Sequence, residues 1–412
     1  MISESGQKVL SLIGQDTESV IEIQKLLTAI PAISPENGGR GEMQKCKTVM
    51  ALLEDIGMDE IIRIDAPDSR AEGGVRPNIL AKIKGKSSVK TIWIMSHMDI
   101  VPPGDLALWH TDPYKTEIKE GKIYGRGTED DHQGIVSSLL LAKALRKANV
   151  LPEYDLGLAI VADEENGSGF GIDYVLKNRP EIIRAKDYII IPDAGNEDGT
   201  MIETAEKSIL WIKCEISGKQ THASTPEKGI NAHRASAHFI LKMHHLYTEF
   251  PDADSVYDPP ISTFEPTKKE TNVDNVNTIP GHDVIYFDCR ILPKYPIESV
   301  KTKIREYADE IQDKLNVRID ISYPNSIPAP PPTSPDAPVA LALQEAVRDI
   351  LNRDAKPIGI GGGTVAAFFR EAGLPAVCWM TVDDTLHGPN EYCKIENVIN
   401  DAKVFAHVCM QD

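Results

Sequence analysis

Short apolar runs alternate with amphipathic segments over the first half of the chain. The runs that predict buried strands lie at 89–95, 156–161 and 188–191, with another late in the chain at 375–380. The periodic segments that predict helices cover about 16–30, 41–56 and 135–148. Strands that alternate with helices are typical of a mostly parallel sheet with helices on its faces. The pattern therefore predicts an α/β fold for this part of the chain.

The pattern changes at Lys207, after which residues alternate only partly between apolar and polar, as in a sheet with one open face. The segments that follow predict strand, helix, strand, strand, helix and strand in turn, at 208–217, 229–250, 275–279, 283–292, 297–315 and 317–323. This order is typical of a small α+β domain. The proline-rich stretch 324–332 resists helix and sheet interiors and indicates an exit linker. We therefore expect a small domain at 207–323, inserted into a larger one formed by 1–206 and 324–412.

Composition supports two domains, because 412 residues exceed one ordinary core. The net charge of −18 argues against nucleic acid or an anionic membrane as a partner. No apolar run approaches the roughly 20 residues of a membrane span, and the first residues lack the pattern of a signal peptide. The six cysteines form no framework of pairs, which fits a reducing cytoplasm.

Two adjacent glutamates, Glu164 and Glu165, come shortly after the apolar run 156–161. Adjacent carboxylates at the end of a buried strand repel each other and are costly to desolvate unless a cation or a proton compensates them. A metal ion would do so, with one carboxylate binding it and the other acting on its bound water. Taken alone, the pair is also explained by an acidic turn in contact with solvent.

His97 and Asp99 follow the apolar run 89–95 in the same way. A His-x-Asp step allows the imidazole to bind a metal while the aspartate holds its other ring nitrogen. A surface histidine beside an aspartate is the alternative. Asp130 and Asp131 lie just before the predicted helix 135–148, where an ordinary acidic first turn is the alternative.

Asp193 and His387 complete the set, since each follows a predicted strand. Open α/β sheets place their sites at the carboxyl ends of the strands. Two histidines and several carboxylates at that edge suit two divalent ions of the zinc, cobalt or manganese type, roughly 3.5–4 Å apart. A structural zinc site would use cysteines instead, and none of the cysteines here form a close pair.

At these motifs the chain resembles a family of zinc-dependent exopeptidases and deacylases. The family includes carboxypeptidase G, the aminoacylases, acetylornithine deacetylase, succinyl-diaminopimelate desuccinylase and related dipeptidases. The resemblance covers nearly the whole chain in the family's order. The motifs that carry it are 96–102, 125–131, 163–168, 218–224 and the late His387.

The resemblance implies a role for each candidate residue. Asp130 would bridge two metal ions. His97 and Asp193 would complete one metal site, and Glu165 and His387 the other. Glu164 would be the general base, Asp99 would support His97, and the Asp130–Asp131 peptide would be the family's cis bond.

The chain departs from the family pattern in two places. His132-Gln133 replaces the Lys-Gly or Met-Lys that often follows the bridging aspartate, and we do not expect His132 to be a ligand. Position 193 carries aspartate, where the family's deacylases and carboxypeptidases usually have glutamate and its dipeptidases and aminopeptidases tend to have aspartate. This residue modestly favours peptide substrates.

The inserted domain carries further candidates. His222 matches a family histidine that crosses the dimer interface and polarises the scissile carbonyl; a surface histidine is the alternative. Asn277 and Arg290 resemble positions that contact substrate, although Arg290 could form a structural ion pair. Gly363 and Thr364 precede a predicted helix and could offer backbone N–H groups to a carboxylate, or could form a plain loop.

The sequence thus predicts a cytoplasmic, homodimeric hydrolase with two divalent metal ions, zinc before cobalt or manganese. Its substrate would be a dipeptide, a peptide end or an N-acyl amino acid. The larger domain would be catalytic and the inserted one would serve as a dimerisation or lid domain. A compact aminopeptidase of a related dinuclear family is one rival interpretation, and a catalytically silent metal-binding or scaffold protein is another.

Overall fold

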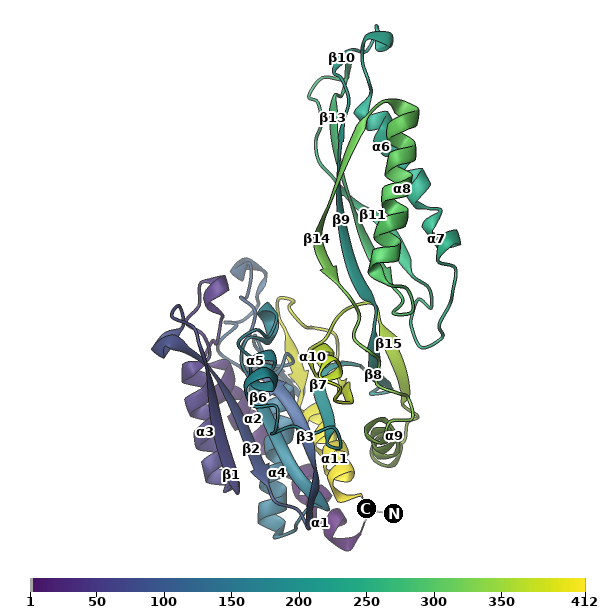
Figure 1. Ribbon diagram of the computed structural model, residues 1–412. Coiled ribbons are helices and arrows are strands. Elements are labelled where there is room, and N and C mark those ends of the chain that lie inside the picture. Colours follow the sequence, from purple (N-terminus) through teal and green to yellow (C-terminus); the bar gives the residue numbers. More distant parts are fainter. Residues whose placement is uncertain (1–2, 412) are drawn as a thin grey trace. The chain divides into compact units, whose positions relative to one another are not determined.

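The computed structural model describes residues 3–411, which form two compact units (Figure 1). Unit 1 contains the chain up to Thr204, Thr333–Pro357 and the residues from Thr364 onward. Unit 2 contains Ala205–Pro332 and Ile358–Gly363. The assignment of catalytic and lid roles to the two parts stays a prediction. No helix within residues 3–411 combines the length and apolar character that crossing a membrane requires.

A mixed eight-stranded sheet has the order β1-β2-β6-β3-β7-β16-β8-β15. Its strands are β1 (Glu60–Pro67), β2 (Val75–Ile83), β3 (Ser87–His97), β6 (Tyr154–Val161), β7 (Tyr188–Asn196), β8 (Met201–Glu206), β15 (Lys356–Ile360) and β16 (Ala376–Thr381). The four central strands β6, β3, β7 and β16 pair in parallel, whereas β1, β2 and β8 pair antiparallel with their neighbours. Helices flank this sheet, so the predicted α/β class is confirmed.

Alternation along the strands sends apolar side chains to both faces of the sheet. On β3, Ile92 and Ile94 enter one core cluster, while Trp93 and Met95 enter another. The first cluster includes side chains from the helices α1 (Glu4–Gly14), α2 (Thr17–Thr28), α3 (Met43–Ile56), α4 (His132–Ala148), α9 (Pro338–Leu351) and α11 (Ile395–Met410). The second includes side chains from α5 (Ile172–Asn178) and α10 (Ala366–Glu371). Both faces are therefore covered, which explains why the central strands are continuously apolar.

The parallel centre of the sheet determines where the loops of unit 1 meet. Strands β3, β6, β7 and β16 run in one direction, so the residues at their carboxyl ends share one edge. A small three-stranded sheet adds β4 (Glu117–Lys119), β5 (Lys122–Tyr124) and β17 (Tyr392–Lys394), in the order β17-β5-β4. The pairing of β17 with β5 joins the segment after His387 to the segment before Asp130.

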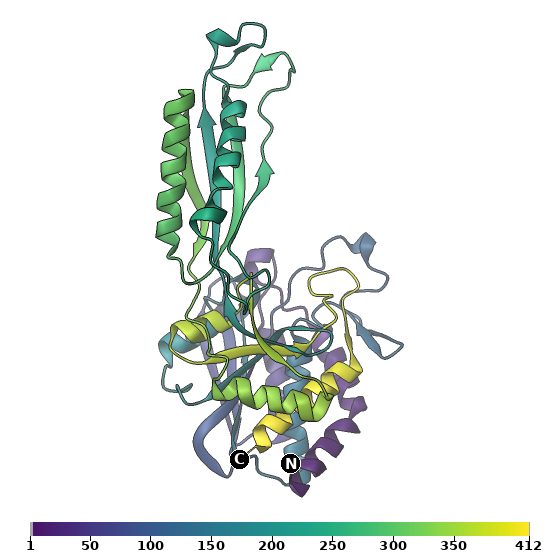
Figure 2. The ribbon, with the colours of Figure 1, turned by 90° about the vertical axis from the view of Figure 1, so that its right-hand side faces the viewer.

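Unit 2 is a four-stranded antiparallel sheet with helices along its strands (Figure 2). The sheet has the order β11-β13-β9-β14, with β9 (Ser208–Ser217), β11 (Thr263–Lys269), β13 (His282–Ile291) and β14 (Arg318–Ile327). Its core joins the sheet to α6 (Ala232–Met243) and α8 (Ile297–Leu315), where the rings of Phe239 and Phe287 pack edge to face at 6.0 Å. The remaining elements are α7 (Leu246–Glu249) and a two-stranded ladder of β10 (Thr221–His222) and β12 (Thr278–Ile279).

The predicted elements agree best where the periodicity is long. The helix expected at 297–315 is α8 with the same bounds, and the strand expected at 283–292 is β13. The helix expected from 135 begins at His132, because Asp131 caps it by accepting the Gly134 N–H at 3.1 Å. The sequence analysis gave no element at α1 or β11.

Candidate metal centre

His97 ends β3 and is buried at the carboxyl edge of the sheet. Its Nε2 lies 2.9 Å from Asp130 Oδ1 and 3.6 Å from Asp193 Oδ1. Its Nδ1 lies 3.0 Å from the backbone oxygen of Asp99 and 3.6 Å from the Asp99 carboxylate. The backbone carbonyl of Asp99 therefore holds the second ring nitrogen more closely than the carboxylate does. With Nδ1–H donated to that carbonyl, Nε2 is left to face the two aspartates.

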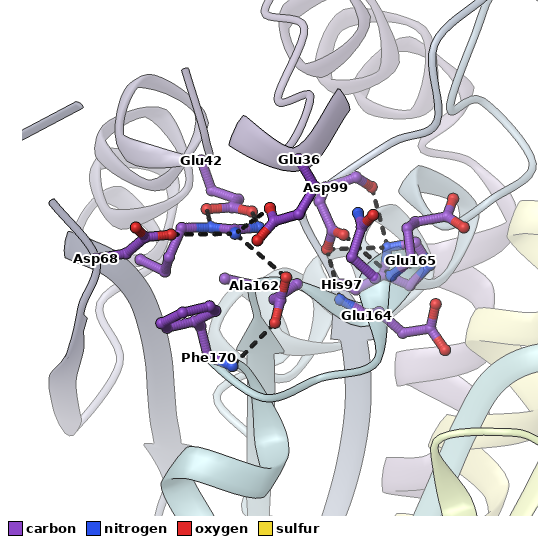
Figure 3. A network of polar contacts seen from close by, with 12 residues as sticks. Glu36, Glu42, Asp68, His97, Asp99, Ala162, Glu164, Glu165 and Phe170 are labelled. Atoms are coloured by element: carbon purple, nitrogen blue, oxygen red, sulfur yellow. Dashed lines mark hydrogen bonds and ion pairs between the residues drawn. The ribbon is translucent and has the colours of Figure 1, made fainter. Parts of the chain in front are cut away.

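The carboxylate of Asp99 has another set of partners. It accepts the backbone N–H groups of Glu164 at 3.0 Å and Glu165 at 3.1 Å (Figure 3). Burial opposes ionisation, but the bonds from His97 and from these two amides hold the pKa of the Asp99 carboxyl below its ordinary value. One aspartate thus fixes both His97 and the turn that carries the two glutamates.

Asp130 occupies the centre of the cluster. Its Oδ2 lies 3.0 Å from His387 Nε2, and its Oδ1 faces His97. The peptide bond between Asp130 and Asp131 is cis, as the resemblance implied. Burial raises the pKa of the Asp130 carboxyl, but hydrogen bonds from His387 and His97 outweigh this effect and keep the pKa below its ordinary value.

Glu165 and His387 lie together on the other side of Asp130. The His387 Nε2 is 3.1 Å from Glu165 Oε2. The Oε1 atom of Glu165 is buried and has no hydrogen-bond partner within residues 3–411. An unpartnered buried carboxylate oxygen that points into a cluster of acids and imidazoles fits a metal ligand.

Two groups of three side chains could each hold an ion, with ligand atoms within 4.8 Å of one another. The first contains His97, Asp130 and Glu165, and the second contains His97, Glu164 and Asp193. These groups contain four of the five predicted ligands together with Glu164, and the fifth, His387, contacts Asp130 and Glu165. The position of Glu164 alone does not separate a base from a ligand.

The electrostatics of this cluster call for a cation. Burial, followed by the charge of Asp193, raises the pKa of the Glu164 carboxyl well above its ordinary range. Burial likewise raises the pKa of Asp193 and of Glu165. A divalent ion would compensate these charges, so the residues present fit the metal that the sequence predicts.

His132 contacts two side chains that lie outside the acidic cluster. Its Nε2 lies 2.6 Å from the Nζ of Lys45 on α3, and its Nδ1 lies 3.4 Å from the Thr28 hydroxyl on α2. Burial and the charge of Lys45 lower the pKa of His132 well below its ordinary value. His132 is a member of neither ligand group, and that it is not a ligand stays a prediction. Lys45 is a buried cation that the sequence analysis missed.

Arg76 on β2 is a second buried cation that the sequence analysis missed. It is fully buried, and its Nε donates to Glu42 at 2.7 Å (Figure 3). It also lies 3.2 Å from Asp163, which has φ 63° and accepts the Phe170 N–H at 2.9 Å. Arg76 thus holds the residue directly before Glu164. The available signal was weak: the arginine stands shortly before the apolar run 79–81.

The predicted substrate residues lie mostly in unit 2. His222 is exposed on β10, and its Nδ1 accepts the Ser224 N–H at 3.1 Å. Asn277 is exposed, and its carbonyl accepts the Ala223 N–H. Arg290 pairs with Asp288 at 2.6 Å and donates to the Gly361 carbonyl at 2.8 Å, so the structural ion pair that was the alternative for this residue is present.

The last two candidates flank the boundary between the units. Gly363 ends the second segment of unit 2, and Thr364 begins the third segment of unit 1. The Thr364 hydroxyl accepts the Ala366 N–H at 3.2 Å, at the start of the six-residue helix α10. The substrate roles of these residues stay predictions.

A known family model matches most of the chain, including the candidate metal centre. The family model described as "Peptidase family M20/M25/M40" matches residues 93–411, which include every residue of the acidic cluster. The chain belongs to this family. Its members are metal-dependent hydrolases that typically use zinc. The resemblance to exopeptidases and deacylases is therefore confirmed.

Curated relatives cover the chain almost completely. An uncharacterized metallohydrolase of Methanocaldococcus jannaschii is 42% identical over 409 residues, covering 95% of this chain and 98% of that protein. A succinyl-diaminopimelate desuccinylase of Nitratiruptor is 27% identical over 395 residues, covering 94% and 98%.

Solved structures share the fold at low identity. Aminopeptidase PepT from Bacillus cereus aligns with a TM-score of 0.75 at 22% identity, covering 96% of this chain and 98% of that one. Human carnosine dipeptidase 1 aligns with a TM-score of 0.73 at 19% identity, covering 100% and 99%. These neighbours support the fold class.

Cation binding at this cluster should strengthen as the pH rises. Hydrogen bonds to Asp130 and Glu165 raise the pKa of His387 to about 10. Below that pH the imidazole carries a proton that a metal ion has to displace. Calorimetric titration with Zn²⁺ between about pH 6 and about pH 7.5, in buffers of different ionisation enthalpy, should show tighter binding at the higher pH and net proton release. An affinity that is independent of pH would contradict the assignment of His387 as a ligand.

Proposed function

We propose that this protein is a dinuclear metal hydrolase that cleaves the amide bond of a dipeptide, a peptide end or an N-acyl amino acid. The observation that carries the proposal is the convergence of two histidines and four carboxylates at one edge of the eight-stranded sheet. His97 and the four carboxylates form two overlapping ligand groups, and His387 contacts two of these carboxylates. The expected homodimer and the expected cytoplasmic location are part of the same proposal.

The residues divide between two ions as the resemblance implies. Asp130 would bridge the two ions, a role supported by its two oxygens, which face His97 on one side and His387 on the other. His97 and Asp193 would complete one site, and Glu165 and His387 the other. Ions bound in this way polarise an amide carbonyl and lower the pKa of water. Zinc suits the imidazole and carboxylate ligands, and cobalt or manganese could replace it.

Glu164 is the best candidate for the proton transfer. Its carboxylate lies near the Asp193 end of the cluster, and its backbone is held by Asp99. Burial and neighbouring charges raise the pKa of Glu164, which favours a group that has to accept a proton and release it again. Glu164 would take the proton of the attacking water and return it to the leaving amine.

Two substrate classes each have support among the similar proteins. The desuccinylase among the relatives favours an N-acyl amino acid, whereas Asp193 and the dipeptidase and aminopeptidase neighbours favour a peptide. Both substrates contain a linear amide next to a carboxylate or an amine. A direct comparison of the two classes in one assay distinguishes them.

Hydrolysis should depend on metal. We expect the protein to hydrolyse a member of a panel of dipeptides, N-acetyl amino acids and N-succinyl amino acids, and to lose this activity on chelation. Zinc, cobalt or manganese should restore it, and elemental analysis of active protein should give about two ions per chain. Active protein that contains no metal would refute the proposal, and metal-bound protein that hydrolyses no amide would favour a silent metal-binding protein.

The two adjacent glutamates should respond differently to the same change. Glu164→Gln should keep both ions and lose about 10²–10⁴-fold in turnover, because only the base is removed. Glu165→Gln should lower the affinity for one ion, because a ligand is removed. Metal content and kcat measured on both variants test the assignment, and each variant controls for the other. Loss of metal from Glu164→Gln but not from Glu165→Gln would reverse the two roles.

His222 is proposed to act in the site of a partner subunit. Homodimers of His222→Ala and of Glu164→Ala should each be nearly inactive. In a mixed dimer, one site combines an intact Glu164 with the partner's intact His222. Random reassortment makes about half of the dimers mixed, so activity should return to about a quarter of wild type.

Co-expression with two different tags isolates the mixed dimer and verifies subunit exchange. If His222 acts within its own chain, both sites of the mixed dimer remain defective. No recovery of activity in a verified mixed dimer would therefore exclude the proposed role across subunits.

A further inference from the structure

Two buried glutamates outside the ligand set each bind the loop that contains the other. Glu129 immediately precedes Asp130, yet its carboxylate accepts the N–H groups of Asp383 at 2.6 Å and Thr385 at 2.7 Å. The Thr385 hydroxyl adds a third bond to Glu129 at 2.6 Å. Glu129 thus holds the loop that leads to His387.

Glu391 makes the reciprocal contacts. It lies four residues after His387, and its carboxylate accepts the N–H groups of Gly127 at 3.0 Å, Glu129 at 2.9 Å and Asp130 at 3.1 Å. Both glutamates have no exposed surface. Five backbone amides from the two loops therefore end on two buried carboxylates, each supplied by the opposite loop.

Arg126 closes the arrangement. Its side chain is almost fully buried and donates to Glu391 at 2.5 Å. The same guanidinium donates to the carbonyls of His387 and Gly388, each at 3.1 Å. One cation thus neutralises Glu391 and binds the backbone of the metal-ligand candidate itself.

His387 has little packing of its own to hold it in place. Its side chain is 55% exposed, and its backbone has φ 59°. Its Nε2 nevertheless lies within 3.1 Å of both Asp130 and Glu165. The backbone contacts of Glu129, Glu391 and Arg126 therefore have to supply the rigidity that side-chain burial does not.

We propose that Glu129, Glu391 and Arg126 are positioning residues that set the separation of Asp130 and His387. We call these three residues the reciprocal clamp. The inference rests on the proposed function, because the clamp serves a metal site built by Asp130, Glu165 and His387. The site that contains His97 and Asp193 depends on it less, since Asp99 and the strand ends hold those residues.

Conversion of either glutamate to glutamine should weaken one metal site selectively. In Glu391→Gln, an NH₂ group replaces one of two carboxylate oxygens that face backbone donors, so the loops lose part of their attachment. We expect the affinity for one of two ions to fall about 10–100-fold, the usual effect of removing a partner behind a ligand. The other ion should remain bound, and added metal should restore much of the lost kcat. Glu129→Gln should behave similarly.

Amide hydrogen exchange in the metal-free, full-length protein tests the clamp without any catalytic assay. Glu391→Gln should speed exchange at Gly127, Glu129 and Asp130, in the opposite loop. Glu129→Gln should speed exchange at Asp383 and Thr385.

Glu203→Gln is the matched control, because Glu203 is also fully buried and binds an arginine, Arg370, through two bonds of 2.8 Å. Its loss should lower the melting temperature and leave the stoichiometry and affinity for metal unchanged. The proposal is overturned if Glu203→Gln lowers the affinity for metal ions as much as the clamp variants do. It is also overturned if the clamp variants bind both ions with wild-type affinity.

The outcome for the clamp is separable from the outcome for the proposed function. Wild-type protein that binds no ion refutes the function. Amide hydrogen exchange still tests the proposed clamp in that case, because the exchange is measured on the metal-free protein. Exchange that stays unchanged in both variants overturns the clamp even if wild-type protein is an active metal hydrolase.

Discussion

The repulsion among acidic side chains at one edge of a sheet is the constraint on which this structure depends. Asp99, Asp130, Glu164, Glu165 and Asp193 all approach His97 at the carboxyl ends of the central strands. Charges of one sign in a water-poor environment destabilise a fold unless they are compensated. The protein retains them, and the surrounding residues show how it does so.

The carboxylates around the cluster centre accept hydrogen bonds from donors of the protein. Asp99 takes the amides of Glu164 and Glu165, and Glu391 takes the amides that precede Asp130. Buried cations stand behind these acids, with Arg126 against Glu391 and Arg76 against Glu42. The remaining carboxylate oxygens, such as Glu165 Oε1, are left without such a donor. Protein donors and cations therefore compensate the charges at the periphery, whereas Glu165 Oε1 at the centre lacks a donor in the described part of the chain and a metal ion fits there.

The sequence predicted the sheet edge well because local patterns determine it. Apolar runs locate the strands, and the polar residues after them locate His97, Asp193 and His387. Parallel pairing then brings these residues together without further information. The mixed character of the outer strands was less visible, since the antiparallel strand β2 has a buried apolar segment, 79–81, like that of a parallel strand.

The supporting residues could not be predicted in this way because their partners are distant in sequence. Arg126 and Glu391 are separated by 265 positions, and Lys45 and His132 by 87. No periodicity or spacing connects such pairs. Even the motif around Asp130 shows Glu129 as one acid among three in a row, with no sign that it faces a different loop. The metal ligands could be predicted because only a few residue types bind metal ions. A side chain that forms a hydrogen bond with a backbone amide or carbonyl can be of many types, so residue type alone does not identify it.

The division of the chain into two units separates two parts of the proposed chemistry. Every member of both ligand groups belongs to unit 1, and so do Asp99 and the reciprocal clamp. His222, Asn277 and Arg290 belong to unit 2. In the proposed function, ion binding would need only residues of unit 1, while substrate recognition would draw on residues that ion binding does not use. Under this proposal, changes in unit 2 would alter which amide is accepted and would leave the compensation of charge at the centre untouched, because that compensation uses residues of unit 1 alone.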